Sequence, residues 1–375
     1  MSRPILLALA ASLTMSTAAF AEAPSVVASV KPLHSLVAAV MGDLGTPALI
    51  VDGSASPHTY SLKPSDARAL QQADIVFWTG HGLELFLEDA IGTLAPNATV
   101  VELAETPGIE LLPPREGGAF EAHAHDEDGE HDHAHDDHGH DHGHDDGHEH
   151  AHESEARDHD HHDGDDHDHG AEAHAHVGHD HHAGNDHAGH DHADHDHADH
   201  DHAHDEEDMH FFLDPANAKL MVSAIAASLA AADPDNADAY RANAAATSDD
   251  LDALITETDA RLAPVKDRPF VVFHDAYQYF ENRFGLNVAG SITINPELAP
   301  GAERIGEIRD RLKSADAACV FAEPNFEPKV VDVLIEGTGA RAGVLDPEGA
   351  SLEPGPRLYR QLIENLATGL VDCLR

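Results

Sequence analysis

A long stretch rich in histidine and aspartate interrupts this chain of 375 residues. All but five of the 35 histidines lie between His123 and His204, and no aromatic residue occurs from Glu121 to Met209. Such a composition cannot bury enough apolar surface to offset the entropy of ordering the chain. We therefore predict that residues 117–208, the His/Asp tract, form a disordered insertion, and that the fold is built from the chain on either side.

The charge of the protein is concentrated in the same tract. The formal net charge is −49, but 32 of the 70 acidic residues lie between Glu121 and Asp208, where Arg157 is the one basic residue. The remainder of the chain is mildly acidic and has no basic patch that could neutralise phosphates. The composition therefore indicates a protein that does not bind nucleic acid.

The first residues have the features of an export signal. Arg3 supplies a positive charge, residues 5–13 form an apolar core, and Ala19-Phe20-Ala21 is a small-residue cleavage site. A membrane anchor is the alternative, but the apolar core is too short and is interrupted by Ser and Thr. We predict that residues 1–21 are a signal peptide cleaved near Ala21, that no later segment spans a membrane, and that the mature protein is exported.

Two cysteines, Cys319 and Cys373, lie in the last part of the chain. An exported protein meets an oxidising environment, which favours a disulfide. Two buried thiols are the alternative.

Short apolar runs alternate with helical patterns on both sides of the tract. The runs occupy residues 26–30, 47–51, 75–79 and 99–103 before it, and residues 269–273, 287–294, 318–322 and 341–345 after it. This alternation is typical of parallel sheets flanked by helices. We predict an α/β fold of two lobes, each a mainly parallel sheet. The N-terminal lobe covers residues 22–234, one long linking helix covers 235–263, and the C-terminal lobe covers 264–375.

The histidines outside the tract lie near strand ends. His58 follows the second apolar run in a Gly/Ser/Pro loop, His274 directly follows residues 269–273, and Asp346 follows residues 341–345. Ligands of open parallel sheets gather at the carboxyl ends of strands, and imidazoles completed by a carboxylate suit zinc. We predict a metal site shared by the lobes, formed by His58, His210, His274 and Asp346. A hydrogen-bonded surface residue is the alternative for any single histidine.

The ordered motifs resemble the ZnuA type of periplasmic zinc-binding protein, which serves ABC uptake transporters. The resemblance is carried by SPHTYSLKPSDARALQQADIVFWTG (56–80), MHFFLDPANA (209–218), FHDAYQYFENRFGL (273–286), NPELAPGAERIGEIR (295–309), CVFAEPNF (319–326) and VLDPEG (344–349). It covers the chain from about Val26 to the C-terminus without the tract, and many members of the family carry such an insertion.

The resemblance implies zinc held in a cleft by His58, His210 and His274. Relatives vary in the fourth ligand, among an aspartate matching Asp346, a glutamate before the first histidine, and water. Because Pro57 takes that preceding position here, Asp346 is the better candidate. The family also implies a disulfide between Cys319 and Cys373. Manganese-binding relatives have a glutamate where this chain has His274, so imidazole there favours zinc, while nickel and copper stay open.

Two further histidines are not expected to be metal ligands. His34 is interpreted as a structural residue near the start of the first helix. His81 lies near the cleft but outside the ligand positions of the family.

The tract has three interpretations: a low-affinity zinc collector, a sensor of periplasmic zinc, or a solvated spacer. Closely spaced histidines in it can chelate metal, but binding must order the chain, so these sites should be weaker than the cleft. A spacer needs no histidine, which favours the first two. The auxiliary ligands are expected to include His131, His133, His135, His200, His202 and His204.

The expected function is that of a periplasmic solute-binding protein. It would deliver Zn²⁺ to an ABC permease and its ATPase subunit as a monomer, with a periplasmic zinc chaperone as a further partner. The alternatives are a zinc buffer or metallochaperone, a binding protein for manganese or nickel, and a zinc hydrolase. No nucleophile elbow, phosphate loop or HExxH helix is present, so we expect no enzyme activity.

Overall fold

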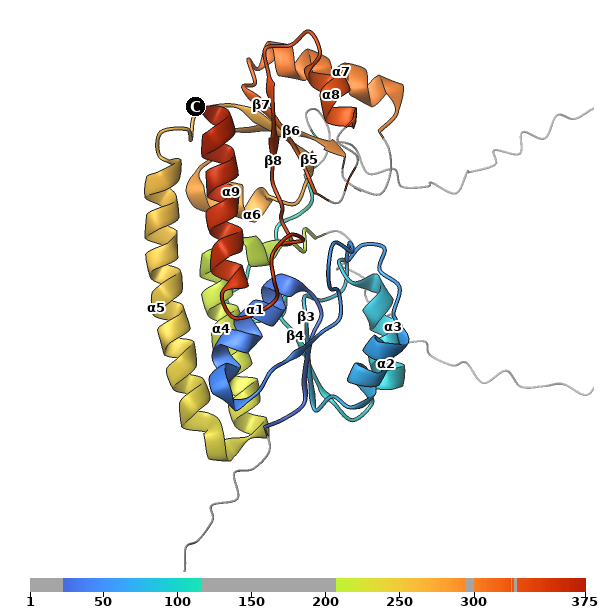
Figure 1. The fold of residues 1–375 in the computed structure, drawn as a ribbon, viewed down its shortest axis with the longest axis vertical. Helices are drawn as coiled ribbons and strands as arrows, with labels where there is room; N and C mark the ends of the chain where they lie inside the picture. Colours follow the sequence, from blue (N-terminus) through green and yellow to red (C-terminus); the bar gives the residue numbers. More distant parts are fainter. Residues whose placement is uncertain (1–22, 116–119, 121–206, 294–299, 325, 327–328) are drawn as a thin grey trace, which may run out of the picture. The chain divides into compact units, whose positions relative to one another are not determined.

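The N-terminal half of the protein forms a four-stranded parallel sheet in the computed structural model (Figure 1). The structure describes residues 23–115, 120, 207–293, 300–324, 326 and 329–375. The strands lie in the order β2-β1-β3-β4, and their bounds are β1 Val26–Ala28, β2 Ala48–Leu49, β3 Ile75–Trp78 and β4 Thr99–Glu102. Helices α1 Lys31–Met41, α2 Pro64–Gln71 and α3 Leu85–Leu94 connect them. Every residue of the central strands β1 and β3 is buried, as parallel sheets covered on both faces require.

The C-terminal half repeats this arrangement. Its strands lie in the order β6-β5-β7-β8, all parallel, with bounds β5 Phe270–His274, β6 Val288–Thr293, β7 Cys319–Ala322 and β8 Arg341–Val344. The helices between them are α6 Gln278–Phe284, α7 Ala302–Ser314 and α8 Lys329–Ile335. The predicted fold class of two parallel sheets flanked by helices is thus confirmed.

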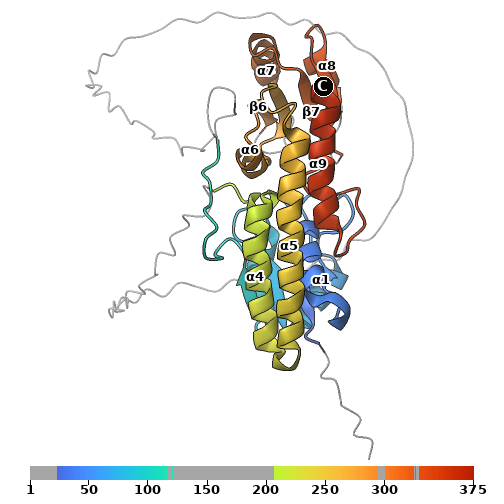
Figure 2. The same ribbon diagram turned by 90° about the vertical axis from the view of Figure 1, so that its left-hand side faces the viewer.

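One helix of 26 residues, α5 (Ala237–Leu262), runs between the two halves. At 1.5 Å per residue it spans about 39 Å. It packs against α4 (Pro215–Ala232), α1 and the C-terminal helix α9 (Leu358–Leu374). Figure 2 shows α4, α5 and α9 side by side. A single long helix with packed neighbours leaves little freedom for bending between the halves.

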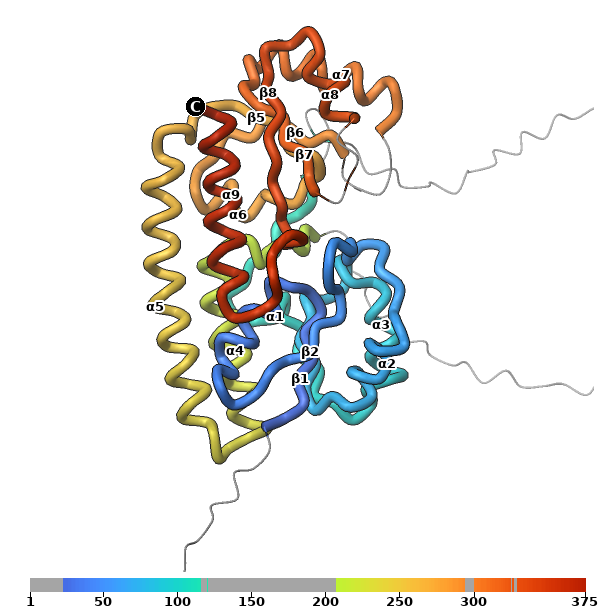
Figure 3. Tube along the Cα trace, viewed as in Figure 1, coloured from blue at the N-terminus to red at the C-terminus, as the bar shows by residue number. Residues whose placement is uncertain are grey.

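The C-terminal segment returns to the N-terminal half, which the sequence did not indicate. After β8 the chain runs down beside α1, and α9 then leads back towards the second sheet (Figure 3). The backbone amide of Tyr359 donates to the hydroxyl of Ser35, and its phenol donates to the carbonyl of Phe212 over 2.7 Å. Buried residues of α9 and of both sheets belong to one continuous apolar core. The two halves are therefore packed together through helices α1, α5 and α9.

Helix α4 is apolar enough, and long enough, to cross a membrane on length and composition alone. We expected no such segment after the signal peptide. Its apolar face, which includes Met221, Val222, Ile225 and Leu229, is fully buried against the rest of the fold. This burial supports its interpretation as a core helix. The expected signal peptide lies outside the described residues.

The boundary of the insertion is shifted from the one expected. Asp208, expected as its last residue, is buried and forms an isolated antiparallel bridge with Leu112. The fold therefore resumes before Met209, because Asp208 has both backbone and side-chain partners. Most of the tract, including its expected auxiliary histidines, lies outside the described residues.

Cys319 and Cys373 form a disulfide, as expected, and join β7 to α9 across 54 positions of sequence. Both residues are buried in the main apolar core. The crosslink fastens the returning C-terminal helix to the second sheet.

We predict that the double variant Cys319→Ala/Cys373→Ala loses about 2–4 kcal/mol of unfolding free energy, because a closed loop of this length restricts the unfolded chain. Urea unfolding followed by circular dichroism would measure it. Reduced wild-type protein should match the variant. Equal midpoints for the oxidised protein and the variant would refute the structural role.

Candidate functional site

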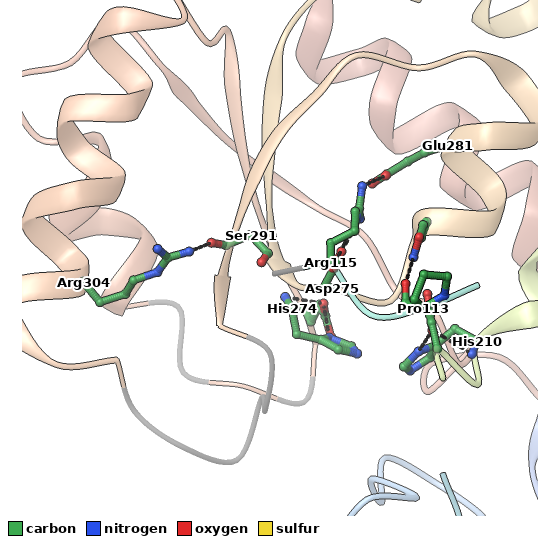
Figure 4. Close-up of polar contacts among 11 residues, drawn as sticks. Pro113, Arg115, His210, His274, Asp275, Glu281, Ser291 and Arg304 are labelled. Carbon is green, nitrogen blue, oxygen red and sulfur yellow. Dashed lines mark hydrogen bonds and ion pairs between the residues drawn. The ribbon is translucent and has the colours of Figure 1, made fainter. Parts of the chain in front are cut away.

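Three histidines converge where the carboxyl ends of the two sheets face each other. His58 lies in the loop between β2 and α2, His210 directly precedes the 3-10 turn Phe211–Leu213, and His274 is the last residue of β5. The ring centroids lie 5.6 Å apart for His58 and His210, 5.9 Å for His58 and His274, and 5.3 Å for His210 and His274. One nitrogen from each ring lies within 4.8 Å of the other two. Figure 4 shows His210 and His274 approaching each other.

The orientation of two of these rings is fixed by carboxylates. The Nδ1 atom of His210 lies 2.8 Å from Oδ1 of Asp208, and Nδ1 of His274 lies 2.7 Å and 2.8 Å from the two carboxylate oxygens of Glu323. A carboxylate only accepts, so in the neutral form of each ring Nδ1 carries the hydrogen and Nε2 keeps its lone pair. The Nε2 atoms of all three histidines are buried without a hydrogen-bond partner among the described residues. Buried nitrogens without partners are costly, and a metal ion would satisfy them.

His58 and His274 do not hold protons equally. Burial, and then the neighbouring His210 and His274, keep the pKa of His58 well below its usual value. Burial also lowers the pKa of His274, but Glu323, together with Asp275 and Asp208, outweighs this effect and the net pKa is raised. His58 is therefore neutral and ready to coordinate at pH 7, whereas a metal must compete with a proton for His274.

A small pocket of about 10 Å³, the room of one water molecule, lies beside His58 and His274. Its acidic lining residues are Glu323, Asp346 and Glu348. Burial, and then Glu323 and Asp346, raise the pKa of Glu348 well above its usual value. A cation bound here would relieve the repulsion among these carboxylates.

Asp346 is not part of the group of three histidines that the geometry brings together. Its Oδ1 accepts the amides of Glu348 at 3.3 Å and Ala350 at 3.0 Å, and its Oδ2 accepts the amide and hydroxyl of Ser351 at 3.3 Å. Asp346 thus lines the pocket but also organises the loop that follows it. Its role as a fourth ligand stays a prediction.

Both ends of the insertion are fixed to α6. The hydroxyl of Tyr279 accepts the amide of Leu112 and donates to the carbonyl of Asp208, each over 2.7 Å. Arg115 forms ion pairs with Asp275 and Glu281 (Figure 4). Burial raises the pKa of Glu281 to about 7, against the opposing effect of Arg115. These contacts hold Asp208, and through it His210, in place.

The remaining two described histidines lie apart from this site. His34 is buried in α1 with Nε2 3.0 Å from the carbonyl of Pro47, consistent with a structural role. His81 lies between Glu88 and Glu102, 3.1 Å and 3.8 Å away, and is not in the histidine group.

The sequence did not identify Asp208 as a partner of His210. The one available signal was its spacing, two residues before a histidine that precedes returning aromatic residues. Glu323 follows the apolar run at residues 318–322, but its bond to His274 joins residues 49 positions apart and depends on strand order.

Comparison with known proteins decides the family. Residues 26–373 match the ZnuA family, described as zinc-uptake complex component A, periplasmic. The chain belongs to the ZnuA family.

Relatives of similar length support this assignment. The high-affinity zinc uptake system protein ZnuA of Brucella abortus is 52% identical over 353 residues, which cover 94% of this chain and 92% of the relative. The protein of the same name from Paracoccus denitrificans is 39% identical and covers 100% and 99%. A crystal structure of a ZnuA deletion mutant with zinc bound has a TM-score of 0.63 at 21% identity, covering 94% and 98%. At that identity it supports the fold.

We predict that Glu323→Gln lowers the pKa of His274 in the metal-free protein, because it removes the carboxylate that contributes most to raising this pKa. Histidine-labelled NMR titration would measure it, with the signal assigned by comparison with His274→Asn. Glu102→Gln, beside His81, is the matched control and should leave His274 unchanged. An unaltered His274 titration in Glu323→Gln would contradict the assigned cause.

Proposed function

We propose that this ZnuA-family protein captures Zn²⁺ between its two halves and delivers it to the membrane permease of an ABC importer. The observation that carries the proposal is that a nitrogen of each of His58, His210 and His274 lies close to one nitrogen of each of the other two. Their Nε2 atoms have no hydrogen-bond partner within the described ranges, and carboxylates orient two of the rings. Nitrogens around a tetrahedral zinc ion at 2.0–2.1 Å lie about 3.4 Å apart. A separation within 4.8 Å therefore needs only a small adjustment.

The proposed ligands are His58, His210 and His274, with Asp346 as the fourth. His58 and His210 belong to the N-terminal half and the other two to the C-terminal half, so the metal would crosslink them. Imidazole at His274 supports zinc rather than manganese, which prefers oxygen ligands. Zinc is cargo here, and we propose no catalytic activity. The family description, together with relatives named as zinc uptake proteins, supports this function.

The cellular location, the bounds of the lobes, the role of the tract and the partners belong to the same proposal. The protein acts in the periplasm as a monomer, after cleavage of residues 1–21 near Ala21. Its lobes are residues 22–234 and 264–375, joined by the helix at 235–263. The His/Asp tract collects or senses zinc at weaker sites, including those at residues 131–135 and 200–204. The permease with its ATPase subunit is the main partner, and a periplasmic zinc chaperone is a second.

We predict one tight zinc site that survives deletion of residues 119–207 and is weakened at least about 100-fold by His274→Ala, since a direct ligand matters more than its supporting partners. Competition with a zinc chelator dye and titration calorimetry would measure affinity and stoichiometry. Several weaker sites should disappear with the tract.

His81→Ala is the matched control and should keep the tight site. Loss of that site with the tract would favour a zinc buffer instead. Tighter binding of nickel or manganese than zinc would redirect the proposal to another metal.

We predict that zinc affinity falls as the pH drops below the raised pKa of His274, because zinc must displace the proton held there. His58, with its depressed pKa, adds no proton competition in that range. Chelator competition between pH 8 and pH 5.5 on the tract-deleted protein would measure this dependence. A zinc affinity that stays constant between pH 8 and pH 5.5 would contradict proton competition at His274.

A further inference from the structure

Lys31 is a buried lysine whose partners lie at the other end of the chain. It is the first residue of α1 and is 5% exposed. Its Nζ atom donates to the carbonyls of Gly349, Ala350 and Leu352, at 3.2 Å, 2.9 Å and 3.0 Å. All three hydrogens of the ammonium group are therefore used. The lysine joins the N-terminal half to a loop of the C-terminal half.

That loop has no helix or strand to satisfy its backbone. Asp346 accepts the amides of Glu348, Ala350 and Ser351 from one side, and Lys31 supplies hydrogens to the carbonyls from the other. Buried backbone groups require partners, so these two side chains together replace the missing secondary structure. The position of Asp346 relative to the N-terminal half thus depends on Lys31.

The three hydrogen bonds of Lys31 contribute little net stability to the fold, because they require a buried ammonium group. No carboxylate forms an ion pair with Lys31 in the part of the chain that the structure describes, and its direct partners are the three carbonyls. Its charge also acts on Glu348 and lowers the pKa of that carboxyl, against the larger effects that raise it. Burying an ammonium group costs several kcal/mol unless it is well paired, and apolar residues of the same volume often stabilise as well. The arrangement instead fixes the position of residues 349–352 relative to the start of α1.

We propose that Lys31 is a positioning residue of the zinc site. By fixing residues 349–352 to the start of α1, it sets the distance between Asp346 and the imidazoles of His58 and His210. It thereby determines whether the carboxylate completes the coordination of the metal. This inference rests on the proposed function and adds a residue that touches no metal.

The test uses the full chain with Lys31→Met, which keeps the length of the side chain but removes its donors. Zinc affinity should fall roughly tenfold, the lower range for residues that support metal ligands. Cobalt at less than one equivalent fills the tightest site, and its visible absorption reports coordination geometry. The absorption of Lys31→Met should shift towards that of Asp346→Asn, which keeps an oxygen for the loop amides but loses the charge.

A double-mutant cycle separates positioning from general stability. Lys31→Met should add little to the loss already caused by Asp346→Asn. Lys31→Gln, which retains an amide donor, should recover part of the affinity and serves if Lys31→Met folds poorly. Lys219→Met, at an exposed ion pair with Asp252, is the matched control and should bind zinc as the wild type does.

Full additivity of the two substitutions, or unchanged affinity and cobalt absorption in Lys31→Met, would overturn the positioning role. Failure of the proposed function is distinguishable, because the wild-type protein itself would then lack a tight zinc site removable by His274→Ala.

Discussion

Three buried nitrogens without a hydrogen-bond partner in the described part of the chain are the constraint on which the rest of this structure depends. The Nε2 atoms of His58, His210 and His274 point lone pairs into one small space. Leaving them there is unfavourable in the metal-free protein. The surrounding chain must therefore hold the rings against their tendency to rotate towards solvent. Asp208 and Glu323 do this through Nδ1, and they fix which nitrogen is left for the metal.

These carboxylates are in turn held by contacts that span the molecule. Asp208 is fixed by Leu112 and Tyr279, and Glu323 also accepts the hydroxyl of Tyr277 at 3.2 Å. The helices α5 and α9 keep the two sheets at a constant separation, since both pack against the N-terminal half and belong to its apolar core. A site built from two halves can be preorganised only when the halves do not move freely.

The fold and the three histidines were predictable because their signals are local. Buried parallel strands appear as continuous apolar runs, and residues that follow those runs lie at one sheet edge. His274 was expected just after a strand and is its last residue, a difference of one position. The edge strand β2 is shorter than its apolar run, although the amides of Ile50 and Val51 still bond to the carbonyls of Ala28 and Ser29. The contributions of Asp208, Lys31 and α9 were not predictable, since each depends on contacts between distant segments.

The pairing of Leu112 with Asp208 also bears on the evolution of the tract. The amide of Asp208 bonds to the carbonyl of Leu112 over 2.8 Å, so the fold itself closes the two ends of the insertion. The entropy of loop closure grows only slowly with length, by about 0.6 kcal/mol for each doubling. Histidine repeats can therefore be gained or lost between these residues with little effect on stability. If the tract collects zinc as proposed, its capacity is free to follow the zinc supply of the habitat, while the three histidines of the fold keep their positions.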